Sequence, residues 1–68
     1  MDRAEFGKML KDERKKKKLT QTGLANLLNV SQGAVARWEK GKNYPTLSKL
    51  FELANIFEIP FDDLMKVG

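Results

Sequence analysis

The sequence predicts an all-α protein, a compact bundle of five helices in which residues 1–68 form one small domain. Three observations support this fold class. Apolar residues recur at three- and four-residue steps almost throughout, no segment alternates as a strand does, and capping residues separate the periodic segments. With 68 residues, 41% of them hydrophobic, the chain can bury one modest core but has no room for a second domain or a deep cleft.

The first two helices are marked by apolar spacing and by their end residues. The first is expected over about residues 2–17, because Phe6 and Leu10 lie four apart and Arg14 follows one turn later. Thr20 can cap a second helix, and Asn29 tolerates the left-handed conformation that ends one. Four apolar residues are expected to line the inner face of this second helix: Leu24, Ala25, Leu27 and Leu28.

The third helix is expected to begin after the cap Ser31 and to end at Gly41. Val30, in the connection before it, and Val35 and Trp38, on one of its faces, are expected to be buried. Trp38 could instead stack on nucleic-acid bases, but its spacing from Val35 favours a place in the core.

The last two helices are separated by a proline. Pro45 and Thr46 begin a fourth helix, and Ile59 and Pro60 end it. The stretch FDDLM, residues 61–65, is expected to form a short fifth helix. The apolar residues of the fourth helix again recur at three- and four-residue steps, at Leu47, Leu50, Leu53, Ala54 and Phe57.

A helix, a turn of three residues and a second helix are expected over about residues 20–41, which is the arrangement that places the second helix in the major groove of DNA. The stretches LTQTGLANLLNVSQGAVARWEKGKNYPTL and LFELANIFEIPFDDLM resemble the Cro/phage-repressor (lambda repressor-like) helix-turn-helix family. The resemblance covers about residues 6–66 and implies a five-helix DNA-binding domain.

The resemblance also implies which residues contact the DNA backbone and which form a structural pair. Gln21 matches a family position that hydrogen-bonds a DNA phosphate, and Arg14 and Glu39 match a buried ion pair between the first and third helices. Ser31 stands at a helix N-terminus, where it either contacts phosphate or only caps the helix. Three further residues match the helix end and loop that lie along the DNA backbone: Lys40, Lys42 and Asn43.

Four residues match the groove-facing surface of the family's recognition helix: Gln32, Gly33, Ala36 and Arg37. Gly33 and Ala36 would let the helix backbone come close to the DNA and would fit against thymine methyl groups. Arg37 can bond guanine O6 and N7 in a bidentate manner, and Gln32 can bond adenine N6 and N7. These two side chains are therefore the expected readers of base edges.

The charge distribution favours the same partner. Residues 1–45 hold eleven Lys and Arg against five Asp and Glu, a net of +6, whereas residues 46–68 have a net of −2. A basic front and an acidic back predict an oriented encounter with a polyanion. We therefore expect a double-stranded DNA operator as the partner of a sequence-specific transcriptional regulator, a phage or bacterial repressor.

The acidic back also carries an apolar strip. Phe61, Leu64 and Met65 fall within the short fifth helix, where they either complete the core or form a dimer interface. The dimer is favoured because one recognition helix reads only a few base pairs, and two-fold pairing on a palindromic operator doubles the readout.

Other function classes find less support. The chain has no Cys and no His, and Asp62 and Asp63 meet no nucleophile or base, so we expect no enzyme activity, catalytic residue, metal, cofactor or small-molecule substrate. No membrane span or signal peptide is recognisable, which favours the bacterial cytoplasm or nucleoid. The alternative function is an antitoxin-type protein-interaction module that neutralises a partner protein.

Overall fold

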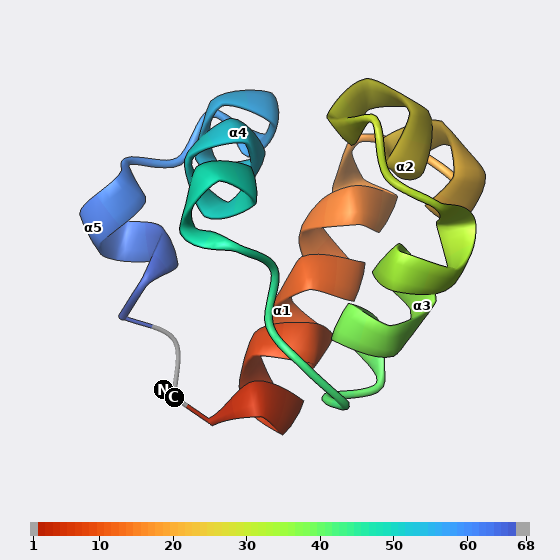
Figure 1. Cartoon of the computed structure of the whole chain (residues 1–68). Helices are drawn as coiled ribbons and strands as arrows, with labels where there is room; N and C mark the ends of the chain where they lie inside the picture. The colour runs from red at the N-terminus through yellow and green to blue at the C-terminus, as the bar shows by residue number, and fades with distance from the viewer. Residues whose placement is uncertain (1, 67–68) are drawn as a thin grey trace.

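The computed structural model of the chain describes residues 2–66, and it is all-helical over that range. Figure 1 shows α1 between two groups of helices, α2 and α3 on one side and α4 and α5 on the other. The helices are α1 (Arg3–Lys16), α2 (Gln21–Leu28), α3 (Gln32–Glu39), α4 (Leu47–Phe57) and α5 (Phe61–Leu64). The predicted order, type and approximate bounds of the five helices are therefore confirmed.

Short polar side chains begin four of these helices. A capping residue stands in extended conformation before the helix, and its side-chain oxygen accepts a hydrogen bond from a backbone N–H of the first turn, which the helix itself leaves unpaired. Pro60, which precedes α5, makes no such bond. The four capping residues are Asp2, Thr20, Ser31 and Thr46.

The helix ends follow backbone conformation. Asn29 ends α2 at φ 57° and Glu58 ends α4 at φ 58°, both left-handed. The backbone N–H of each capping residue bonds back to carbonyls of the last turn, which satisfies acceptors that the helix leaves open. Gly41 follows α3 at φ 73°, where its missing side chain makes room for the backbone of Ala4 in α1.

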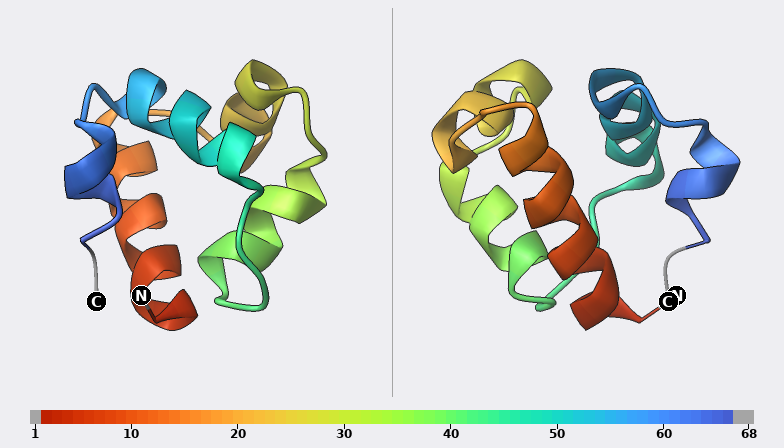
Figure 2. Two further views of the ribbon diagram at one scale, coloured as in Figure 1. Left: turned by 60° about the vertical axis from the view of Figure 1, so that its left-hand side comes forward. Right: turned by 180° about the vertical axis from the view of Figure 1, so that it is seen from behind.

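The core lies where the inner faces of all five helices meet. Phe6 and Leu10 of α1 are fully buried at its centre, and Trp38 is 6% exposed, so the prediction of a core tryptophan is confirmed. The two views of Figure 2 show α1 running beside α3, with the helices in opposite directions. The other buried apolar residues are Leu24, Ala25, Leu28, Val35, Leu50, Leu53, Ala54, Phe57 and Leu64.

The burial of four apolar residues differs from what the sequence favoured. Leu64 is 1% exposed and fills the core of its own chain, so its side chain is not available to a dimer interface. Leu27 and Leu47, expected on inner helix faces, are 55% and 61% exposed because they lie at the edges of the apolar stripes. Val30 is only partly buried, although it packs against the core.

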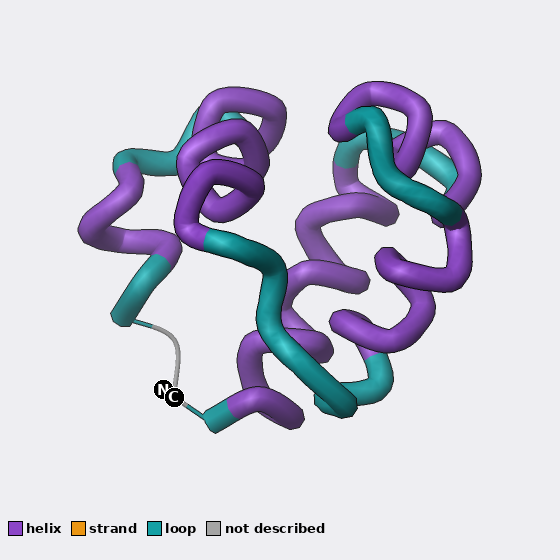
Figure 3. Tube along the Cα trace, viewed as in Figure 1, coloured by secondary structure: helices purple, strands orange, loops and turns teal. Residues whose placement is uncertain are grey.

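Long-range polar contacts hold the two helix groups together. Lys49 Nζ of α4 donates to the carbonyl of Leu28 at 2.6 Å, a favourable place for a cation because this carbonyl ends α2. Lys17, after α1, forms a 2.6 Å ion pair with Glu58. Figure 3 shows the long loop that leaves α3 and crosses α1 to reach α4. These contacts tie α4 to the end of α2 and to the segment that follows α1.

Candidate nucleic-acid interface

The turn between α2 and α3 comprises Asn29, Val30 and Ser31, as the sequence predicts. Asn29 reverses the chain with its left-handed backbone, and the Val30 N–H bonds to the Ala25 carbonyl at 3.0 Å. Ser31 Oγ then accepts a hydrogen bond from the Ala34 N–H at 3.1 Å, which starts α3. The side chain of Ser31 is therefore a cap, while its exposed position leaves the hydroxyl proton free for a ligand.

Arg14 and Glu39 form a buried ion pair between α1 and α3. Arg14 Nε lies 2.6 Å from Glu39 Oε2, and its Nη2 lies 3.2 Å from Oε1. The two side chains are only 9% and 4% exposed. Arg14 Nη1 also donates to the Leu19 carbonyl at 2.8 Å, so the guanidinium ties α3 to the segment that leads into α2. Such bidentate geometry is the strongest form of this contact.

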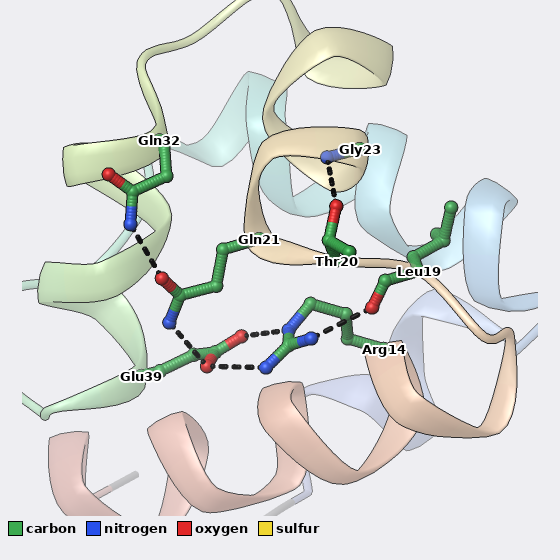
Figure 4. A network of polar contacts seen from close by, with 7 residues as sticks. All are labelled: Arg14, Leu19, Thr20, Gln21, Gly23, Gln32 and Glu39. Atoms are coloured by element: carbon green, nitrogen blue, oxygen red, sulfur yellow. Dashed lines mark hydrogen bonds and ion pairs between the residues drawn. The ribbon is translucent and has the colours of Figure 1, made fainter.

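The ion pair continues toward the surface through two glutamine side chains, as Figure 4 shows. Gln21 Nε2 donates to Glu39 Oε1 at 3.0 Å, and Gln32 Nε2 donates to Gln21 Oε1 at 2.6 Å. Gln32, at the exposed start of α3, is therefore held by a chain of contacts that begins at Arg14 in the interior. This link was missed by the sequence analysis, because Gln21 and Gln32 were assigned there to separate contacts.

The hydrogen bond to Gln21 leaves the Gln32 amide with groups that are free to bind a ligand. Its amide uses one N–H on Gln21 and keeps its second N–H and its carbonyl oxygen. A donor and an acceptor side by side are what the major-groove edge of adenine requires. Gln21 likewise keeps one amide N–H beyond its bonds to Glu39 and Gln32.

The exposed face of α3 carries little side-chain bulk. A methyl group at Gly33 would meet only Arg37 Nη1 at 3.5 Å and Ser31 Oγ at 3.8 Å, both ordinary contacts. The fold therefore does not require glycine at position 33. By contrast, a methyl group at Gly7 would lie 2.5 Å from the carbonyls of Trp38 and Glu39, so that glycine is required for α1 to reach α3.

Arg37 completes this face. Its side chain is exposed, its guanidinium lies beside Gly33, and it has no side-chain hydrogen bond or ion pair within residues 2–66. Ala36 is half-buried next to it. An unengaged guanidinium beside a glycine and an alanine can extend toward a ligand without breaking contacts within the protein.

The loop after α3 carries the remaining candidates for phosphate contact. Lys40, Lys42 and Asn43 are exposed. The Lys42 carbonyl accepts a hydrogen bond from Arg3 Nη1 at 3.2 Å, so the first residue of α1 helps to fix the position of the loop. Arg3 was not singled out in the sequence, because its proximity to the loop depends on the packing of α1 against Gly41.

The described residues offer little else that could carry chemistry. No group of His, Cys, Asp and Glu side chains in residues 2–66 is arranged to hold a metal ion, and this range encloses no pocket. None of the helices described there is long and apolar enough to cross a membrane.

The chain is similar to curated transcriptional regulators. It is 39% identical over 61 residues to the HTH-type transcriptional activator BcrR of Enterococcus faecalis, a match that covers 90% of this chain and 30% of BcrR. The chain spans between 30% and 53% of the length of three such regulators. The similarity is therefore to one part of longer proteins.

Solved structures share the whole fold. The restriction-modification controller protein C.AhdI from Aeromonas hydrophila superposes with a TM-score of 0.83 at 30% identity, covering 93% of this chain and 96% of C.AhdI. The P22 c2 repressor, solved in complex with a synthetic operator, superposes with a TM-score of 0.80 at 29% identity, covering 87% and 89% of the two chains. A helix-turn-helix family profile matches residues 10–64. The chain thus belongs to the Cro/C1-type helix-turn-helix family.

Proposed function

We propose that the chain binds double-stranded DNA in a sequence-specific manner, with α3 in the major groove, and acts as a transcriptional regulator. The observation that carries this proposal is the polar chain from Arg14 and Glu39 through Gln21 to Gln32. It orients an amide at the start of a helix whose exposed face otherwise carries Gly33, Ala36 and the unengaged side chain of Arg37. The similarity to the P22 c2 repressor, solved on operator DNA, supports the same docking mode.

The readers of base edges in this proposal are Gln32 and Arg37. Gln32 presents its free N–H and carbonyl to an adenine, and Arg37 presents its fork to a guanine. Gly33 and Ala36 let the backbone of α3 approach and leave space for thymine methyl groups. The two long side chains therefore discriminate between base pairs, while the two small residues allow α3 to come close to the groove.

The proposed contacts with the DNA backbone lie near both ends of α3. Gln21 offers its second amide N–H and Ser31 its hydroxyl beside the N-terminus of α3, and both reach phosphate oxygens. On the other side, Lys40, Lys42 and Asn43 contact the phosphates from the loop. These contacts set the register of α3 in the groove and are insensitive to sequence.

We further propose that the regulator is a repressor that occludes a promoter as a homodimer on a palindromic operator. Leu47 and Phe51 of α4 expose 61% and 51% of their surface, and the rings of Phe51 and Phe61 stack at a centroid distance of 4.2 Å. Phe61 and Met65 are half-buried at the same end of the bundle. The interface would thus comprise Phe51, Phe61, Leu47 and Met65, without the buried Leu64.

Selection from a library of random DNA duplexes tests the proposed function. The chain is incubated with the library, bound duplexes are amplified over several rounds, and the recovered sequences are aligned and footprinted. We expect a two-fold symmetric site with half-sites about 34 Å apart, one turn of DNA. Recovery of no common sequence, together with equal affinity for all duplexes, would refute the proposal.

A further inference from the structure

A second basic surface lies on α1, outside the proposed groove contacts. Lys8, Lys11 and Lys15 follow one another at steps of three and four residues, so they share one face of the helix. All three are exposed. We refer to these three residues as the lysine stripe.

The lysine stripe, like Lys18, Lys40 and Lys42 among the described residues, lacks the carboxylate partners that four other lysines have. Within residues 2–66, no lysine of the stripe forms an ion pair. Asp12 borders the stripe on the same helix without pairing to it. Four other lysines do have carboxylate partners, at N–O distances of 3.0, 2.6, 3.0 and 3.7 Å: Lys16, Lys17, Lys49 and Lys66.

The packing of α1 shows where the stripe points. Phe6 and Leu10 face the core, and Gly7 and Arg14 face α3. Lys11 lies four residues after Gly7 and three before Arg14, so it borders the contact between α1 and α3 on the solvent side. The stripe therefore occupies the outer face of α1, on the side that adjoins α3.

The exposed face of α3 lies on this same outer side. Glu39 of α3 faces α1, and Val35 faces the core. The two helices run side by side in opposite directions (Figure 2). Around the circumference of α3, Ala36 and Lys40 follow Glu39 in the direction away from the core, so they lie toward the side of the stripe. At one end of α1, Arg3 adds a further cation next to the Lys42 carbonyl. Cations therefore lie both in the loop after α3 and on α1, with the exposed carboxylates of Glu5 and Asp12 near the stripe.

We propose that Lys8, Lys11 and Lys15 bind the sugar-phosphate backbone of duplex DNA beyond the base pairs that α3 reads. The proposal rests on the proposed function, since it requires α3 to bring the DNA to this side of the molecule. Exposed cations that have no ion-pair partner within residues 2–66 can neutralise DNA phosphates, and the counterions that the DNA then releases strengthen binding. The stripe has no large apolar neighbours on its own face of α1, so a membrane surface is a poorer fit.

The test uses the duplex recovered by selection in two lengths, one trimmed to the selected site and one extended by about one helical turn on each side. The stripe variant is Lys8→Gln, Lys11→Gln and Lys15→Gln. The control variant, Lys16→Gln, Lys17→Gln and Lys66→Gln, removes the same charge from lysines that already have carboxylate partners. Circular dichroism verifies that each variant is folded.

We expect the stripe variant to lose about tenfold or more in affinity for the long duplex, and its log–log salt slope to fall by up to about 0.9 for each lysine. Its affinity for the trimmed duplex should match that of the wild type, and the control variant should keep the flank-dependent gain. Asp12→Asn should raise affinity for the long duplex. If the triple variant does not fold, this variant and the single variant Lys11→Gln, which should lower that affinity, test the inference in its place.

Equal losses in the stripe and control variants would show an effect of net charge only and would overturn the inference. A stripe variant that keeps the wild-type gain in affinity from flanking DNA would also overturn the inference. That result would be expected if the stripe binds an acidic protein instead of DNA. These failures differ from a failure of the proposed function, in which selection recovers no site at all.

Discussion

Gln21 and Glu39 are joined by a 3.0 Å hydrogen bond, in which the buried carboxylate accepts from the side-chain amide. Glu39 is also the partner of Arg14, and Gln21 is the partner of Gln32. One carboxylate therefore serves both the packing of α1 on α3 and the orientation of the proposed base-reading amide. Loss of either side chain of the interior pair should therefore also disturb the proposed DNA-contacting surface.

The first prediction concerns stability. Arg14→Ala or Glu39→Ala alone should lower the free energy of unfolding by roughly 3–5 kcal/mol, because each leaves an uncompensated buried charge. The double variant should lose less than the sum of the two single losses. Urea unfolding of the four proteins measures this cycle, and strictly additive losses would show that the two side chains do not interact.

The second prediction separates base reading from backbone contact. Arg37→Ala should cost about 1–3 kcal/mol of binding free energy on the selected site and relax its specificity, because it removes the proposed bidentate base contact. Lys42→Ala should weaken selected and random duplexes alike. Fluorescence titration against both duplexes distinguishes the variants, and a uniform loss in both would contradict the assignment of Arg37.

The third prediction concerns Gly33. Gly33→Ala should raise the free energy of unfolding by about 0.5–1 kcal/mol, because the new methyl group meets only ordinary contacts and alanine favours helix. The same substitution should weaken binding to the selected duplex, because the methyl group stands between α3 and the groove. Thermal melts and titrations are compared with those of Gly7→Ala, which should destabilise the fold. A Gly33→Ala protein with unchanged DNA affinity would show that no close approach occurs there.

The fourth prediction concerns pH. The hydrogen bond and charge of Lys17 lower the pKa of Glu58 below its ordinary value of 4.5. Since the folded-state pKa is the lower one, the ion pair stabilises the fold above pH 4.5, and this stabilisation is lost as the pH falls through the folded-state pKa. Melting temperatures of wild type and Glu58→Gln should thus differ slightly at neutral pH and converge in acid. A difference that widens in acid would contradict this.

The fifth prediction concerns assembly. Phe51→Asp should abolish cooperative binding to the full palindrome while leaving half-site affinity intact, because it places a charge in the proposed apolar interface. Ser48→Asp, also exposed on α4, serves as the control for added charge. Band shifts on full and half sites measure both. If the wild type binds the two DNAs with equal affinity and without cooperativity, the proposed dimer does not form.

Local signals predicted the helices because their ends depend on few neighbouring atoms. Thr20, Ser31 and Thr46 cap the helices at the expected positions, and Asn29 adopts the expected left-handed conformation. These contacts lie within a few residues of each other in the sequence. The turn length followed directly from them, and it is the turn that made the helix-turn-helix recognisable.

Burial at the edges of apolar stripes was less predictable. In α5, one turn of helix leaves the inward face undetermined, and tertiary packing placed Leu64 inside while Phe61 turned toward Phe51. The bond between Gln21 and Gln32 joins two helices whose relative placement no local pattern specifies. Contacts of this kind could be identified only from the structure, because they depend on how helices pack against each other.

The close approach at Gly7 has a thermodynamic consequence for binding. The carbonyls of Trp38 and Glu39 lie where a side chain at position 7 would stand, so α1 and α3 are in backbone contact with little freedom to shift. If α3 is the recognition helix, as proposed, a helix seated in this way loses little conformational entropy when it meets DNA. Calorimetry should then show a heat-capacity change set by the surface buried at the interface, without the larger contribution that accompanies folding of a segment upon binding.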